Sequence, residues 1–106
     1  MADLQVVAVI TAKAGSESLV GDALRTLAES ARSDQGCIAF DLFTSTTDPA
    51  TFVAIEMWRS QGDLDAHLNS PPVRQAFESA SDHLAQAPAI YPLSKTSYPA
   101  SRRQAS

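Results

Sequence analysis

The chain has 106 residues, which is enough for one small domain and too few for two. Hydrophobic residues make up 44% of it and charged residues 19%, the composition of a folded globular domain and not of a disordered segment. Eight Lys and Arg stand against 12 Asp and Glu, which gives a formal net charge of -4. This charge argues against nucleic acid and anionic membrane surfaces as partners.

The sequence also argues against metal and cofactor sites. Its single cysteine, Cys37, cannot close a disulfide within the chain, and His67 and His83 are too far apart in sequence to form a zinc-binding pair. No glycine-rich phosphate-binding loop is present, so we expect neither metal nor flavin nor haem. The longest apolar run, 6–10, is far shorter than a membrane span, and the N-terminus has no basic signal region, so we expect a cytoplasmic protein.

A strand and a helix are predicted first. Residues 4–11 are rich in β-branched side chains, apolar on both faces, and predict a strand. From Ser16 onwards the apolar positions recur at steps of three and four, which is typical of one stripe along a helix. The residues of this stripe are Val20, Leu24, Leu27 and Ala31.

A hairpin is predicted next. Residues 37–45 and 51–59 indicate two strands, and the turn residues 46–50 between them favour antiparallel pairing. Both faces of the second strand carry mainly apolar side chains. One face has Phe52, Ala54, Glu56 and Trp58, and the other has Val53, Ile55 and Met57. Because neither face is typical of a solvated surface, we expect both to be covered.

Two helical segments and a last strand complete the predicted domain. Residues 61–69 indicate a short helix, and a second helix begins at the Ser70-Pro71-Pro72 sequence. Its buried stripe is predicted to comprise Val73, Ala76, Phe77, Ala80 and Leu84. Residues 89–93 predict a strand in which Pro92 favours an edge position. We expect residues 1–94 to form the domain and the polar tail 95–106 to be dispensable for folding.

The element order is βαββαβ, which predicts an α+β ferredoxin-like fold with an antiparallel sheet. Two right-handed crossovers place both helices on one side of this sheet, so its second face stays bare. Because the three long strands are apolar on both faces, the bare face would expose a large apolar patch. We therefore predict a homodimer in which two sheets pack face to face.

Several residues, taken in order, resemble one family. Gly36-Cys37 opens a strand, Phe52-x3-Glu56-x-Trp58 follows, and Leu64-x2-His67-x2-Ser70 and Phe77 come after it. Over residues 4–94 this pattern resembles the antibiotic biosynthesis monooxygenase family of dimeric α/β barrels. The resemblance implies a pocket between sheet and helices and, as in several members, oxidation of quinols or polycyclic phenols by O2 without metal or flavin.

Such a reaction needs a dry aromatic pocket and a group that removes a proton, because the substrate itself supplies the electrons. We expect His67, Trp58 and Glu56 to be the catalytic residues. The side chains expected to bind an aromatic substrate are Phe40, Phe43, Phe77 and Tyr91. Trp58 and His67 should occupy facing walls of the pocket.

Each of these residues also has a structural interpretation. Trp58 and His67 can serve packing alone, and Glu56, costly to bury, is expected to pair with His67 or with a helix N-terminus. Cys37 is best interpreted as a small buried hydrophobe. Ala54 stands where oxygenases of this resemblance have a carboxamide, and Phe77 where haem-degrading relatives have their iron-binding histidine.

Two other functions therefore remain open. An isomerase or lyase acting on a small oxygenated metabolite would use His67 to move a proton and would not need O2. A ligand-binding or structural dimer without catalysis is favoured by Ala54. Oxygen uptake separates the first from an oxygenase, and ligand binding without turnover would support the second.

Overall fold

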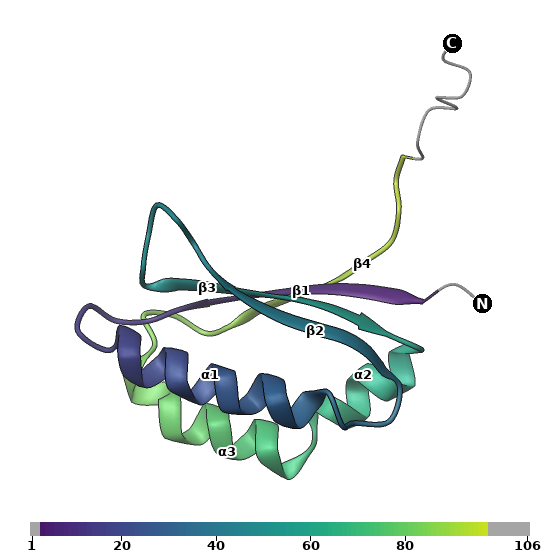
Figure 1. The fold of residues 1–106 in the computed structure, drawn as a ribbon, viewed down its shortest axis with the longest axis horizontal. Coiled ribbons are helices and arrows are strands. Elements are labelled where there is room, and N and C mark those ends of the chain that lie inside the picture. The colour runs from purple at the N-terminus through teal and green to yellow at the C-terminus, as the bar shows by residue number, and fades with distance from the viewer. Residues whose placement is uncertain (1–2, 98–106) are drawn as a thin grey trace.

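The computed structural model describes residues 3–97, which form one antiparallel four-stranded sheet covered by helices on one face. The strands are β1 (Leu4–Thr11), β2 (Cys37–Thr44), β3 (Thr51–Trp58) and β4 (Ala89–Leu93), in the order β2-β3-β1-β4. In Figure 1 the sheet forms the upper layer and the helices the lower layer. This is the α+β ferredoxin-like fold that the element order predicts.

The helices are α1 (Glu17–Ala31), α2 (Gln61–Leu68) and α3 (Pro71–Ala80), followed by the 3-10 turn η1 (Ser81–His83). The stripe predicted for α1 is buried at all of its positions. The predicted division between α2 and α3 is also confirmed, and prolines occupy the first turn of α3. Within residues 3–97, none of the helices is long and apolar enough to cross a lipid bilayer.

The C-terminal end of α3 differs from the sequence-based expectation. Helix α3 ends at Ala80, so Leu84 is not part of its stripe. Leu84 instead follows the 3-10 turn, pairs with Ala12 in an isolated antiparallel bridge and packs against the core from there. The helical period cannot continue because η1 has three residues per turn instead of 3.6.

Strand β4 lies at the edge of the sheet, as Pro92 predicts, and pairs only with β1 among the strands of residues 3–97. The tail predicted for 95–106 falls mostly outside the described residues, since 98–106 are not among them. Its dispensability for folding therefore stays a prediction.

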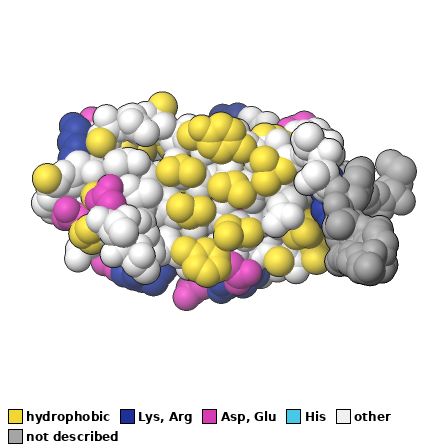
Figure 2. Space-filling model, turned by 90° about the horizontal axis from the view of Figure 1, so that it is seen from above, with side chains coloured by type: hydrophobic (Ala, Val, Ile, Leu, Met, Phe, Trp, Pro, Cys, Tyr) yellow, Lys and Arg dark blue, Asp and Glu magenta, His cyan; other side chains and the backbone are white. Residues whose placement is uncertain are grey.

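The core lies between the sheet and the helices. Along β3, every second side chain from Phe52 to Trp58 is buried, while the side chains between them are less covered. The opposite face of the sheet, the outer face, carries large apolar side chains that are exposed in the single chain. On the strands these are Phe43, Ile55, Tyr91 and Leu93, while Ile38 is exposed at the irregularity near the start of β2. Figure 2 shows that apolar side chains occupy the middle of this upper face, and charged ones lie mainly around its margin.

Candidate functional site

The inner sheet face buries two titratable side chains, Glu56 on β3 and His67 on α2. Each is only 5% exposed. Glu56 faces inward because it is in register with Ala54 and Trp58 on the buried side of β3. His67 faces inward because it follows Leu64 by three positions, which places both on one side of α2.

Trp58 connects these two side chains. Its indole N–H donates a hydrogen bond of 2.8 Å to Oε1 of Glu56. The Trp58 ring also packs against the His67 ring, with their centroids 4.7 Å apart and the planes tilted by 34°. A fully buried tryptophan therefore holds the carboxyl group through its N–H and the imidazole through its ring face.

Asp34, in the loop between α1 and β2, is the polar partner of His67. Its Oδ2 lies 2.7 Å from Nδ1 of the histidine. Phe40 packs against the imidazole edge to face, with 5.8 Å between the ring centroids. The histidine is thus held by one carboxylate and two aromatic rings.

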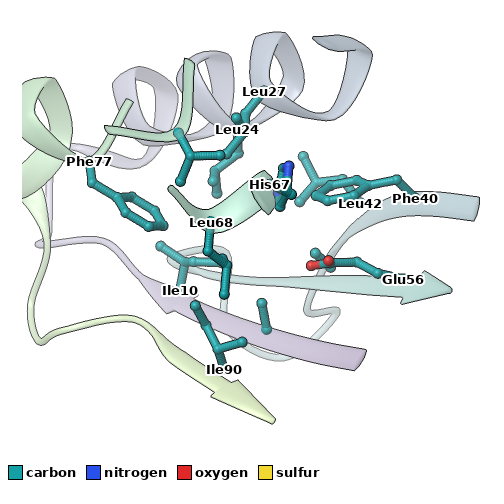
Figure 3. A pocket seen from close by; sticks show the side chains of 13 residues that line it. Ile10, Leu24, Leu27, Phe40, Leu42, Glu56, His67, Leu68, Phe77 and Ile90 are labelled. Atoms are coloured by element: carbon teal, nitrogen blue, oxygen red, sulfur yellow. The ribbon is translucent and has the colours of Figure 1, made fainter. Parts of the chain in front are cut away.

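A small cavity of about 30 Å³ lies beside these groups, between the sheet and the helices. Glu56 and His67 are its only titratable lining side chains among the described residues. The apolar lining comprises Ala8, Ile10, Leu24, Leu27, Phe40, Leu42, Ala54, Leu68, Val73, Phe77 and Ile90. Figure 3 shows Glu56 and His67 toward one end of this space, with Phe77, Leu68 and Ile90 toward the other. The last three are only half-buried.

Burial raises the pKa of Glu56 above that of a free glutamic acid. The hydrogen bond from Trp58 and the nearby His67 act against this rise without cancelling it. A carboxyl group in this position stays protonated to a higher pH than one in water. It can therefore donate a proton as well as accept one.

The expected partner of Glu56 is corrected by this geometry. The expectation was His67 or a helix N-terminus, but the hydrogen-bond partner is Trp58. Residues two apart on one strand face are neighbours, so the indole N–H reaches the carboxylate directly. Trp58 and His67 are also not on facing walls, because their rings are in contact and Trp58 is not among the lining residues.

Two of the four expected substrate-binding side chains lie on the lining and two do not. Phe40 and Phe77 border the cavity. Phe43 and Tyr91 point to the opposite sheet face, where they are 51% and 53% exposed in the single chain. The reason is the alternation along each strand: Phe43 is three positions from the inward Phe40, and Tyr91 follows the inward Ile90.

Cys37 does not add a nucleophile to the site. Its pKa is raised, first by burial and then by the negative charges of Asp34 and Glu56. A raised pKa lowers the fraction of the reactive thiolate form. Within residues 3–97, no three His, Cys, Asp or Glu side chains are grouped closely enough to hold a metal ion.

Sequence reasoning missed Asp34. It lies 33 positions before His67, and the two meet only because the sheet brings the α1–β2 loop beside α2. Its position two residues before Gly36-Cys37, at the start of β2, gives no indication of a histidine partner.

Comparisons with known proteins agree with this fold. Residues 4–79 match the family model described as antibiotic biosynthesis monooxygenase. An uncharacterised protein of Synechocystis sp. is 33% identical over 75 residues, which cover 68% of this chain and 50% of that protein. The chain thus matches about half the length of this curated relative.

Solved structures show the same similarity. A crystal structure of an antibiotic biosynthesis monooxygenase is 28% identical, with a TM-score of 0.82 over 89% of this chain and 99% of that one. The protein PA3566 of Pseudomonas aeruginosa is also 28% identical, with a TM-score of 0.83 over 92% and 97% of the two chains. Because the family model matches well over half of the chain, and the sheet and helices superpose on these structures, this chain belongs to the antibiotic biosynthesis monooxygenase family.

Proposed function

We propose that the protein is a cofactor-independent monooxygenase that oxidises a quinol-like or polycyclic aromatic substrate with O2. The observation that carries the proposal is a buried, otherwise apolar cavity that holds one imidazole and one carboxyl group of raised pKa. Family membership and the similarity to an antibiotic biosynthesis monooxygenase support the same reaction class.

The chemistry assigns a separate task to each polar group. His67 accepts the proton of the substrate hydroxyl and so turns it into an electron-rich phenolate, which can reduce O2 without a cofactor. Oxygen then bonds to a ring carbon as a peroxide. His67 returns its proton to the outer peroxide oxygen, which gives a hydroperoxide. His67 then removes the C–H proton of the same carbon, the C–H electron pair forms the C=O bond, and the O–O bond breaks. The protonated Glu56 donates to the leaving oxygen, which departs as water, and the proton now on His67 restores Glu56. Where the oxidised carbon is a ring methylene, one O2 converts it to a carbonyl group and one water, with all electrons supplied by the substrate.

The apolar lining contributes by excluding water from the reactive oxygen species. A cavity of about 30 Å³ holds roughly two molecules the size of water, and therefore a molecule such as O2. Sites for drug-sized ligands commonly have about 300–1,000 Å³. An aromatic substrate must therefore displace the half-buried Phe77, Leu68 and Ile90 as it enters.

The proposal includes a homodimer. In the single chain, the exposed face of the sheet carries Phe43, Ile55, Tyr91 and Leu93, each at least 38% exposed. A second copy that packs its own sheet on this face would bury these side chains, which is favourable at about 25 cal/mol for each Å² of apolar surface. Phe43 and Tyr91 would then serve association and not substrate binding.

The test is oxygen uptake with a panel of quinols and anthrones, under air and under argon. We expect product only under air, with one O2 consumed for each product molecule. His67→Ala should lower turnover by about 10²- to 10⁴-fold, the usual contribution of a general base. Because the ring is buried against Trp58 and Phe40, the variant should also lose stability, so turnover is measured at a temperature at which it is folded. His83→Ala is the matched control, because His83 lies outside the cavity lining and bonds Ser16.

Other outcomes would overturn the proposal. Equal turnover under argon would identify an isomerase or lyase. Ligand binding without turnover in either gas would identify a binding protein. A folded His67→Ala variant that keeps its turnover would make the histidine structural.

A further inference from the structure

We propose that Asp34 is a positioning residue that keeps the proton of the neutral His67 ring on Nδ1 and leaves Nε2 as a proton acceptor toward the cavity. The inference rests on the proposed function only in so far as His67 is taken as the base. The tautomer itself is a property of the resting protein and can be measured without any substrate.

The contact between the two side chains fixes the proton. Oδ2 of Asp34 lies 2.7 Å from Nδ1 of His67, within ordinary hydrogen-bond distance. An ionised carboxylate has only lone pairs to offer, so the ring nitrogen must donate. A neutral imidazole has a single N–H, so its other nitrogen, Nε2, carries the lone pair.

The packing around the ring keeps this orientation. Two aromatic rings pack against the imidazole. Its ring centroid lies 4.7 Å from that of Trp58 and 5.8 Å from that of Phe40. The histidine side chain is 4% exposed, so it has little room to rotate and exchange its two nitrogens. His67 lines the cavity, whereas Asp34, which binds its Nδ1, does not.

The backbone on the Asp34 side is fixed as well. The Asp34 N–H donates to the Ala31 carbonyl at the end of α1, and the Asp34 carbonyl accepts from the Cys37 N–H at the start of β2. Two positions further, Gly36 has a φ of +83°, in the region that favours glycine. Both backbone groups of Asp34 are thus used to place its carboxylate.

Gly36 also ties this loop to α2, which carries His67. A Cβ atom at Gly36 would collide with the Asp63 side chain, so the glycine permits a close approach. Asp63 in turn belongs to the first turn of α2, where its backbone N–H donates to the Ser60 hydroxyl. The loop and the helix that carry Asp34 and His67 are therefore packed directly on each other.

The experiment is 15N NMR of the histidine rings in the wild-type protein, with the rings in their neutral form. His67→Ala assigns the His67 signals, and His83 provides an internal reference. We expect Nδ1 of His67 to show the shift of a protonated nitrogen and Nε2 that of an unprotonated one. A wild-type ring protonated on Nε2 would overturn the proposal, and this result needs no variant.

Variants then test the role of the carboxylate. Asp34→Ala should move a large part of the proton population to Nε2, because that is the preferred tautomer of a histidine side chain in water. Asp22→Ala removes an exposed carboxylate that pairs with Arg25 on α1, and should leave the spectrum unchanged. An unaltered His67 tautomer in folded Asp34→Ala would also overturn the proposal.

Kinetics separates this inference from the proposed function. If the oxygenase reaction is found, Asp34→Ala should lower kcat by at least about tenfold, a part of what a general base contributes, with KM little changed. An unchanged kcat would contradict the positioning role. If no substrate reacts, the proposed function fails, while the NMR result still decides the tautomer.

Discussion

The two faces of the sheet follow the same alternation of side chains but differ in what covers them. On β3, the face toward the helices has Trp58 and Glu56 buried, and the opposite face has Ile55 more than a third exposed. The chain's own helices cover the first face and leave the second bare. The strands are thus apolar on both faces, and the helices of one chain cover only one of them.

The faces also differ in their polar content. The inner face tolerates a carboxyl group and an imidazole because each has a partner, Trp58 for Glu56 and Asp34 for His67. On the outer face, apolar side chains gather in the middle and charged ones lie mainly around the margin (Figure 2). Chemistry is therefore expected on the inner face and association on the outer one.

The largest expected effect concerns the inner face. Trp58→Ala should lower the free energy of unfolding by about 3–5 kcal/mol, because it leaves a large cavity beside His67 and removes the donor to Glu56. Chemical denaturation measures the loss. Trp58→Phe keeps most of the packing and should cost only about 1–3 kcal/mol, for the carboxyl group left without its donor. Equal losses in the two variants would contradict the role assigned to ring packing.

The second effect concerns the outer face. Ile55→Asp places a charge at the proposed sheet-to-sheet interface and should halve the mass measured by light scattering at micromolar concentration. Leu19→Asp is the matched control, because Leu19 is also exposed and apolar but lies on α1. It should leave the mass unchanged. A wild-type protein with the mass of one chain would show that a second copy does not cover this face.

The smallest effect is a change in pH dependence. The pKa of Glu56 is higher in the folded protein than in the unfolded chain, so the folded state binds the proton more tightly. This group therefore favours folding at low pH, and its contribution declines as pH rises from about 4.3 through the folded pKa. Glu56→Gln, which still accepts from Trp58, should remove this decline.

The comparison for this prediction is the stability difference between variant and wild type across pH. As pH rises from acid to neutral, the free energy of unfolding of Glu56→Gln should increase relative to that of the wild type. The exposed Glu29→Gln on α1 controls for the loss of one negative charge. A difference that is constant with pH would contradict the raised pKa of the buried carboxyl group.

Much of the fold can be predicted from local patterns. The alternation along β3, the stripe of α1 and the prolines that begin α3 each reflect short-range geometry that the sequence carries directly. The period of two also explains why Glu56 faces inward. The same period shows why Phe43 does not: it is an odd number of positions from the inward Phe40.

The missing parts of the site depend on contacts between distant segments. Asp34 and His67 meet across 33 positions, and the register of α2 against the α1–β2 loop decides that contact. The partner of Glu56 is only two positions away, but a tryptophan on a strand has several rotamers, and packing against His67 selects the one observed.

The contact between Trp58 and His67 also gives the protein a built-in optical probe. Trp58 is the chain's single tryptophan, so all indole fluorescence originates beside the cavity. Because Trp58 is fully buried, its emission should report the exclusion of bulk water in the folded state. Protonation of the stacked imidazole or entry of an aromatic ligand would alter that emission, so events at this site can be followed without any added label.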